Sequence, residues 1–154
     1  PGHSSGSVVL YHEQEKLLFS GDTILKHITP NPVYEQKSDG SRLKSLLAFH
    51  DTMEKLSKLT YSCIIPGHGE WIYDFQEIHQ RYENSWQKRK QKILKFISEN
   101  QPLSAYSLAG LLFRKLENLN VYLGVSEVIG YLDWLEADGS IRLDGSHPVI
   151  ITAT

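Results

Sequence analysis

Three short glycine-bearing stretches of the sequence each carry one side chain that can bind a metal ion. They are Pro1-Gly2-His3, Ser20-Gly21-Asp22 and Pro66-Gly67-His68-Gly69. Imidazole nitrogen and carboxylate oxygen are ligands that a borderline ion such as zinc accepts. A carboxylate between two histidines can also bridge two metal ions that activate a shared water molecule. His3, Asp22 and His68 are therefore the candidate metal ligands, and Asp22 is also the candidate catalytic residue.

Each candidate ligand stands next to a hydrophobic run that predicts a strand. The apolar runs at residues 8–11 and 16–20, with polar residues between them, predict a β-hairpin that ends just before Asp22. Residues 61–65 predict a strand that ends at the loop carrying His68. Strand ends hold side chains rigidly, while the loops beyond them leave room for a water ligand. The lone cysteine, Cys63, is expected to be a small core residue of the last strand.

Two long amphipathic helices are expected around these strands. Apolar residues at spacings of three and four predict a helix over residues 41–59, with Ser41 as its N-cap. The same periodicity predicts a helix over residues 74–100, which Pro102 would end. Residues 24–40 contain two turn signals and predict an irregular surface loop. Tyr34 in that loop could contact a substrate, but the sequence assigns no substrate-binding residue.

The segment beyond Pro102 predicts two shorter helices and a terminal hairpin. Ser104 or Ser107 could cap the first helix, whereas Ser126 is expected to cap the second, which Gly139 would end. Residues 141–143 and 149–151 would form the hairpin around residues 144–146. Three helices followed by a hairpin is the order of a winged helix. The predicted domains are therefore residues 1–73 and, with the long connecting helix, residues 74–154.

The composition narrows the class of protein. The chain has 154 residues, of which 40% are hydrophobic and 22% charged, and its formal net charge is −2, as in globular domains. A dedicated nucleic-acid binder usually carries a basic excess. No apolar run approaches the roughly 20 residues of a membrane helix, so we expect a cytoplasmic protein with no membrane partner. One cysteine excludes an internal disulfide and a cysteine-rich zinc module.

In their order, the three glycine-bearing stretches resemble the last three metal motifs of the metallo-β-lactamase superfamily. The separations of 19 and 46 residues, from 3 to 22 and from 22 to 68, fit as well. The long helix and the tail resemble the subgroup that includes the β-lactamase-like 2 proteins. That superfamily folds as an αββα sandwich of two similar halves. The resemblance implies an α/β chain that forms the C-terminal half of the sandwich, followed by a mostly helical winged-helix domain.

The resemblance also implies a dinuclear zinc hydrolase. It assigns His3 to the first metal, Asp22 to the bridge and His68 to the second metal. The implied reaction is attack of water on a small-molecule thioester or ester, or on an RNA phosphodiester. The His-x-His-x-Asp-His motif, which supplies the other ligands in that family, occurs nowhere in this sequence. We therefore expect a portion of a longer protein, inactive or nearly so by itself, with partial or no zinc occupancy. Its expected partner is the missing N-terminal half, and a homodimer is a second possibility.

A competing interpretation makes the tail a winged-helix module that binds nucleic acid or protein. The basic run at residues 88–92 could touch phosphates, although a solvated helix face is the commoner cause of such a run. The would-be recognition helix at residues 126–138 is acidic, and acidic side chains repel phosphates. A packing, substrate-covering or dimerisation role is therefore favoured. Tyr122, Tyr131 and Trp134 are aromatic candidates for such a contact, or for the core.

The remaining histidines are not expected to bind metal. They are predicted to be solvated or core residues because none stands in a cluster of ligands. His79 is the one that could approach the site, because it follows the last glycine-bearing loop closely. The set is His12, His27, His50, His79 and His147.

Overall fold

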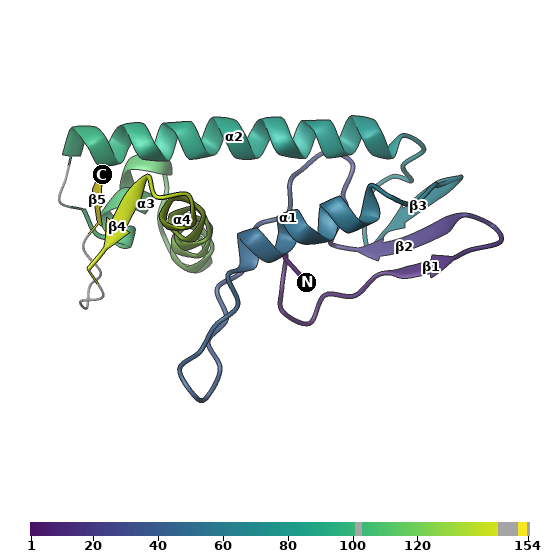
Figure 1. Cartoon of the computed structure of the whole chain (residues 1–154), viewed down its shortest axis with the longest axis horizontal. Helices are drawn as coiled ribbons and strands as arrows, with labels where there is room; N and C mark the ends of the chain where they lie inside the picture. The colour runs from purple at the N-terminus through teal and green to yellow at the C-terminus, as the bar shows by residue number, and fades with distance from the viewer. Residues whose placement is uncertain (101–102, 145–150, 154) are drawn as a thin grey trace. The chain divides into compact units, whose positions relative to one another are not determined.

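The chain is a mixed α/β protein, as the sequence predicts. The computed structural model describes residues 1–100, 103–144 and 151–153. It divides into two compact units, residues 1–86 and 87–154, described separately below. Our assignment of domains to residues 1–73 and 74–154 stays a prediction. The elements in chain order are β1 (Leu10–His12), β2 (Leu17–Gly21), α1 (Ser45–Leu56), β3 (Cys63–Pro66), α2 (Phe75–Asn100), α3 (Ala105–Leu112), α4 (Leu119–Ala137), β4 (Ile141–Leu143) and β5 (Ile151–Ala153) (Figure 1).

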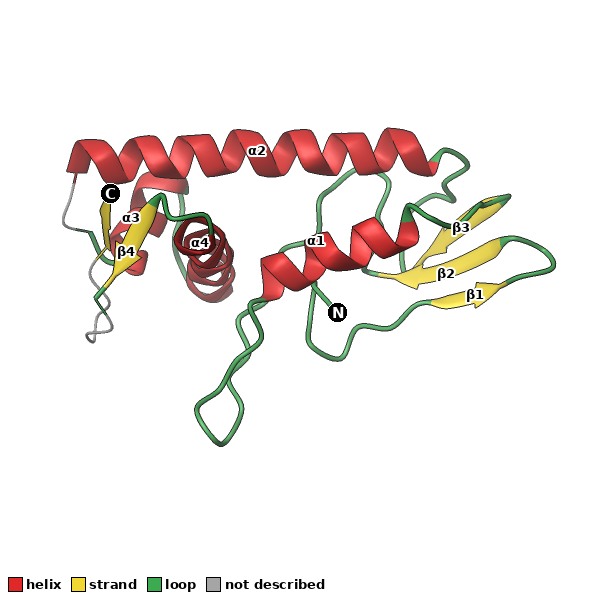
Figure 2. Cartoon of the chain, in the orientation of Figure 1, coloured by secondary structure: helices red, strands yellow, loops and turns green. Residues whose placement is uncertain are grey.

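The first unit contains a three-stranded sheet in the order β1-β2-β3 (Figure 2). Strands β1 and β2 form the predicted antiparallel hairpin, in which Leu10 pairs with Phe19. Strand β2 runs parallel to β3, with Phe19 opposite Ile65 and Gly21 opposite Pro66. Because the carboxyl ends of parallel strands meet at the same edge of a sheet, the loops that follow β2 and β3 start side by side.

One face of this sheet is buried under the two long helices. Leu18 of β2 and Ile64 of β3 are fully buried, as are Phe49 of α1 and Trp86 of α2. The Phe49 and Trp86 rings pack edge to face at a centroid distance of 5.3 Å. Cys63 is also buried, so the prediction that it is a core residue is confirmed.

The expected start of the first helix was wrong. Helix α1 begins at Ser45, with Lys44 at the N-cap position, and Ser41 caps nothing. Instead, the backbone N–H and the hydroxyl of Ser41 donate to the Asp39 carboxylate at 2.9 and 2.6 Å, in a turn that the bond from the Lys37 N–H to the Ser41 carbonyl closes. A side chain that bonds to its local backbone competes with helix formation, and here the turn prevails. The preceding loop is also not wholly superficial, since Ile24 is fully buried.

The second unit comprises the end of α2, two further helices and a hairpin. Ser104 is the N-cap of α3 and accepts the N–H of Ser107 at 3.1 Å, which decides between the two predicted caps. Helix α4 begins at Leu119, so the prediction that Ser126 caps it was wrong, and Ser126 is buried within the helix. Gly124 packs close to the Phe113 ring, where a Cβ atom would come within 3.0 Å of a ring carbon. This glycine therefore serves helix packing and does not interrupt α4.

The end of α4 and the terminal hairpin agree with expectation where they are described. Gly139, with φ of 79°, follows the C-cap of α4, and its N–H donates to the carbonyl of Glu136. Strands β4 and β5 pair antiparallel. Residues 145–146 and 149–150, which the prediction placed in this hairpin, lie outside the described residues. The element order is that expected of a winged helix, but the winged-helix assignment stays a prediction.

The exposure of two aromatic side chains and the character of the helices bear on two further predictions. Tyr131, a candidate for an exposed aromatic contact, is buried, whereas Tyr122 is exposed. Among the described residues, no helix has the length and apolar character needed to cross a bilayer. The expected cytoplasmic location stays a prediction.

Candidate metal site

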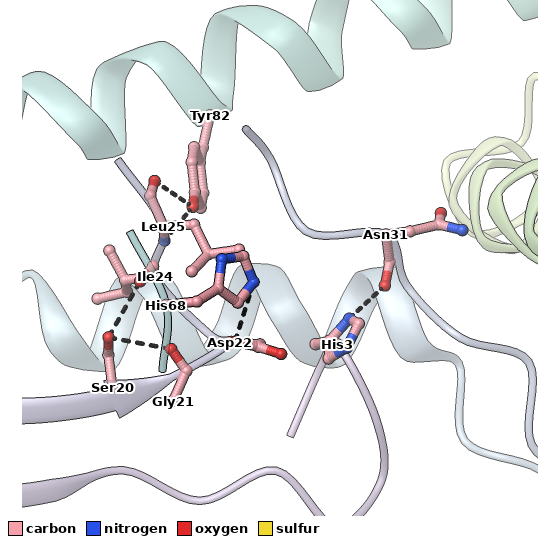
Figure 3. A network of polar contacts seen from close by, with 9 residues as sticks. All are labelled: His3, Ser20, Gly21, Asp22, Ile24, Leu25, Asn31, His68 and Tyr82. Atoms are coloured by element: carbon pink, nitrogen blue, oxygen red, sulfur yellow. Dashed lines mark hydrogen bonds and ion pairs between the residues drawn. The ribbon is translucent and has the colours of Figure 1, made fainter. Parts of the chain in front are cut away.

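Two of the three predicted ligands lie together at the edge of the sheet. Asp22 directly follows β2, His68 follows β3, and Asp22 Oδ1 is 3.4 Å from His68 Nε2 (Figure 3). Both side chains are open to solvent, with 43% of Asp22 and 61% of His68 exposed. The parallel pairing of β2 and β3 brings these residues together, although they are 46 positions apart in the chain.

The two loops are joined by their backbones as well. The N–H of Gly67 donates to the carbonyl of Gly21 at 2.8 Å. A Cβ atom at position 67 would lie 2.7 Å from Asp22 Oδ1, which real Cβ contacts do not allow. Glycine at position 67 is therefore required for the close approach of Asp22 and His68.

The third predicted ligand, His3, is held by the loop that leads into α1. Its Nδ1 lies 2.8 Å from the carbonyl oxygen of Asn31 (Figure 3). The carbonyl of His3 in turn accepts the N–H of Val33 at 2.9 Å. Because a carbonyl can only accept, Nδ1 is the donor, and in the neutral ring Nε2 keeps the lone pair that could bind a metal. A backbone carbonyl that fixes the ring in this way is the usual support of a metal-binding histidine.

The donors of this chain fit part of a zinc site. Two ligands of a tetrahedral zinc ion, at bonds of about 2.0–2.1 Å, lie about 3.4 Å apart, as Asp22 Oδ1 and His68 Nε2 do. Within the described ranges, however, no three His, Cys, Asp or Glu side chains converge closely enough to hold a metal ion. The chemistry and separation of one donor pair therefore suit zinc, while the number of ligands falls short of four.

An exposed ion cluster that the sequence reasoning missed connects the same two loops. Glu70, two residues after His68, pairs with Lys26 and with His27, whose Nε2 lies 3.2 Å from Glu70 Oε1. The hydrogen bonds from Lys26 and then His27 lower the pKa of Glu70. The charges at positions 26, 27 and 70 were visible in the sequence, but only the parallel strand pairing makes them neighbours.

His79 belongs to the contact between α1 and α2. Its Nε2 lies 3.8 Å from Glu54 Oε1 and 3.9 Å from Glu83 Oε1, and its ring stacks on Phe75 at 5.5 Å. His50 Nδ1 approaches the same Glu83 oxygen at 3.3 Å. Burial raises the pKa of Glu83, and the charge of His79 acts in the opposite direction. Both side chains are largely buried here, which agrees with the prediction that His50 and His79 are solvated or core residues.

The other two described histidines are solvated, as predicted. His12 is exposed in the hairpin turn, where its Nδ1 accepts the N–H of Glu15 at 3.2 Å. His27 is exposed within the ion cluster above. His147 lies outside the described residues.

The basic run on α2 is partly occupied by contacts within the second unit. Arg89 Nε lies 3.2 Å from Glu127 Oε1, and Lys90 Nζ lies 2.5 Å from Asp138 Oδ2. Lys90 also stands 4.1 Å above the ring of Trp134. These two charges pack α2 against α4, which favours the structural interpretation of the run over phosphate binding.

The sequence profile of the metallo-β-lactamase superfamily matches residues 1–95. The chain belongs to this superfamily. A probable metallo-hydrolase of Bacillus subtilis strain 168 is 30% identical over 142 residues, 92% of this chain and 44% of that protein. A β-lactamase-like protein 2 homologue of Drosophila melanogaster is 29% identical over 148 residues, 95% of this chain and 47% of that protein. The predicted resemblance to the β-lactamase-like 2 subgroup is thus confirmed.

Two further similarities concern chemistry and fold. An atrochrysone carboxyl ACP thioesterase of Aspergillus fumigatus is 27% identical over 94 residues, 61% of this chain and 26% of that protein. The crystal structure of a metallo-β-lactamase family protein from Thermus thermophilus superposes with a TM-score of 0.82 at 23% identity, over 100% of this chain and 47% of that one. The chain thus spans less than half the length of each of these four proteins.

Proposed function

We propose that this chain supplies Asp22, His68 and His3 to the site of a zinc-dependent hydrolase that cleaves a thioester or a related ester. The observation that carries the proposal is the pair of donors, 3.4 Å apart, at the ends of two parallel strands. Membership of a superfamily that includes a metallo-hydrolase and a thioesterase supports the reaction class. The oriented ring of His3 supports its role as a further ligand.

The residues of this chain would bind and orient the reacting groups. Zinc, when bound, lowers the pKa of a coordinated water to about 7 and polarises a carbonyl oxygen. The Asp22 carboxylate would accept a hydrogen bond from the attacking water and hold it in line with the ester carbon. His68 and His3 would offer their Nε2 atoms as ligands. The hydrogen bond between His3 Nδ1 and Asn31 keeps the His3 ring from turning away.

We also propose that the remaining half of the sandwich packs on the open face of the β1-β2-β3 sheet. This face presents Leu10 and Phe19, which are 67% and 46% exposed. The chain covers 44–47% of the two relatives that it matches over nearly all its length, so about half of such a protein is unaccounted for. A chain without that half would have too few metal ligands and an uncovered apolar sheet face, and both features are seen among the described residues.

The test of the hydrolase proposal is the substitution Asp22→Asn in a longer chain that contains the upstream half of the fold. The substitution keeps the size of the side chain and removes its charge. We expect zinc-dependent hydrolysis of an acyl thioester, followed by release of the thiol, to fall by about 10²–10⁴-fold. Ser5→Ala, in the exposed part of the loop that carries His3, is the control. Unchanged hydrolysis in Asp22→Asn would remove the proposal, and cleavage of labelled RNA alone would reassign the substrate.

The second unit is proposed to be a winged-helix-like packing module and not a reader of nucleic acid. Supporting observations are the ion pairs of Arg89 and Lys90, which engage two of the basic side chains of residues 88–92. Binding of a fluorescent single-stranded RNA to the 154-residue chain, measured against salt concentration, tests this proposal. We expect weak binding with a shallow slope. A steep loss of affinity with salt would favour a nucleic-acid module instead.

A further inference from the structure

The hydroxyl of Tyr82 makes two hydrogen bonds, both to the backbone of Leu25 in the loop that carries Asp22. Tyr82 is fully buried in α2, and its ring packs against Phe49 at 6.3 Å and Trp86 at 5.7 Å. Its Oη accepts the N–H of Leu25 at 2.8 Å and donates to the carbonyl of Leu25 at 2.9 Å (Figure 3). Burial raises the pKa of Tyr82 to about 12, so the hydroxyl keeps the proton that it donates.

The loop between β2 and Leu25 is closed by bonds of its own. Ser20 is fully buried, and its Oγ donates to the carbonyl of Ile24 at 3.0 Å. The backbone carbonyl of Ser20 accepts the N–H of Thr23 at 3.0 Å. Figure 3 shows Asp22 between these anchored ends, with its carboxylate beside His68. These bonds close the loop on itself, and the Tyr82 hydroxyl restrains its C-terminal end together with Arg81, whose Nη2 donates to the Leu25 carbonyl at 3.1 Å.

We infer that Tyr82 is a positioning residue for Asp22, acting through the backbone of residues 20–25. Tyr82 touches neither Asp22 nor any reacting atom in this arrangement. It fixes Leu25, the closed loop transmits that position to Asp22, and the bond from Gly67 to Gly21 sets the loop against His68. The consequence for metal binding rests on the proposed role of Asp22 as a ligand.

The chain offers a matched control for the loss of this hydroxyl. Tyr61 donates its hydroxyl to the carbonyl of Leu56 at 2.6 Å, at the end of α1 and away from the Asp22 loop. Burial raises its pKa to about 12 as well. Tyr82→Phe and Tyr61→Phe therefore each remove one desolvated tyrosine hydroxyl that bonds to backbone, and only the first would affect Asp22.

Amide hydrogen exchange in the 154-residue chain separates positioning from simple packing. In Tyr82→Phe we expect the protection of the Leu25 amide to fall about tenfold, because its acceptor is lost. The Thr23 and Gly67 amides, which are not bonded to Tyr82, should lose protection too if the loop moves as a unit. Amides in α1 report global stability, and Tyr61→Phe should leave Leu25, Thr23 and Gly67 unchanged. Loss of protection at Leu25 alone would overturn the inference.

The zinc affinity of a longer chain that contains the upstream half of the fold, measured by competition with a chromogenic chelator, provides the second readout. Loss of a supporting contact typically weakens metal binding by about 10–100-fold, which we expect for Tyr82→Phe and not for Tyr61→Phe. Equal affinities in wild type and Tyr82→Phe would overturn the inference. If the wild type binds no zinc while the exchange result holds, the proposed function fails and the positioning of Asp22 stands.

A second variant guards against a general loss of structure. If Tyr82→Phe lowers protection throughout α1, the substitution Ser20→Ala interrupts the same loop at its other end by removing the bond to Ile24. We then expect faster exchange of the Gly67 amide with α1 unaffected. An unchanged Gly67 amide in Ser20→Ala would count against transmission through the loop.

Discussion

The two faces of the β1-β2-β3 sheet are built from alternate residues of the same strands, yet their surroundings differ. On one face Leu18 and Ile64 are fully buried under the helices. On the other, Leu10 and Phe19 face solvent. A sheet with one solvated face usually alternates apolar with polar residues, whereas a sheet covered on both faces is apolar throughout. The sequence of these strands is therefore suited to burial on two sides, and this chain provides the cover for one.

The same division runs through the candidate site. The loops that follow β2 and β3 bring Asp22 and His68 to a separation that suits two ligands of one metal ion. Under the proposed function, the ligands besides Asp22, His68 and His3 come from the upstream half of the fold, since the described residues hold no converging group of three. Four predictions examine this contrast.

The largest effect is expected on the covered face. Leu18→Ala should lower the free energy of unfolding by about 2–5 kcal/mol, because it leaves a cavity in a fully buried position. Leu10→Ala, on the open face of the neighbouring strand, should change it by less than about 0.5 kcal/mol. Urea denaturation of the 154-residue chain measures both. Equal losses would show that the two faces do not differ in the way described here.

At the edge between the two ligand loops, Gly67→Ala should disturb the site itself. The new Cβ would meet Asp22 Oδ1 at 2.7 Å, so the carboxylate or the loop must move, at a cost of about 1–3 kcal/mol. Gly6→Ala, in the loop that carries His3, meets nothing within 4 Å and is the control. Thermal unfolding of the 154-residue chain, and zinc competition in a longer chain that contains the upstream half of the fold, measure the two consequences. A Gly67→Ala chain that matched Gly6→Ala in both would contradict the close approach of these loops.

A substitution on the open face of the sheet tests whether the upstream half of the fold binds there. Phe19→Asp should leave the stability of this chain almost unchanged, because the ring is already half exposed. It should weaken binding of the upstream half of the fold, supplied as a separate polypeptide, by about tenfold or more, as expected for an aromatic contact at an interface. Calorimetry measures the binding. Sedimentation of the wild type is the control, and a stable dimer that Phe19→Asp dissociates would identify a second copy as the occupant.

Much of this arrangement could be predicted from the sequence because strong periodicity dominates local structure. The hairpin and the helix α2 follow from apolar patterns, whereas the grouping of Asp22 with His68 was predicted from their glycine-bearing motifs and the resemblance to the superfamily. The starts of α1 and α4 were predicted wrongly because the periodicity of apolar residues does not report local side-chain contacts. Ser41 bonds to Asp39 in a turn, and the chain before Ser126 is already helical from Leu119, with Gly124 packed against Phe113.

The supports of the site could not be predicted for a different reason. Tyr82 fitted the apolar stripe of α2, and nothing in that stripe reveals that its hydroxyl bonds to the backbone of Leu25. The partner of His3 is likewise a main-chain carbonyl, that of Asn31. Backbone groups are present at every residue, so contacts to them leave no signal in the sequence.

The smallest effect concerns the helical cover of the buried face and depends on pH. Burial raises the pKa of Glu83 above its usual 4.5, so the folded state binds more protons than the unfolded state once the pH exceeds that value. The contribution of Glu83 to stability is therefore fully present below pH 4.5 and is lost as the pH rises through the raised pKa. Because the group is partly open to solvent, we expect a loss of less than about 1 kcal/mol. His79, His50 and Glu54 lie around the same carboxylate.

Glu83→Gln isolates this contribution, since the amide keeps the size of the side chain and cannot ionise. The variant should lose less stability than the wild type as the pH rises above 4.5, as measured by urea denaturation at a series of pH values. Glu13→Gln, in the exposed hairpin turn, is the control. A Glu83→Gln profile that ran parallel to the wild type would mean that His79 and His50 compensate the buried carboxylate fully. Burial of Glu83 between α1 and α2 would then have no net cost in stability over this pH range.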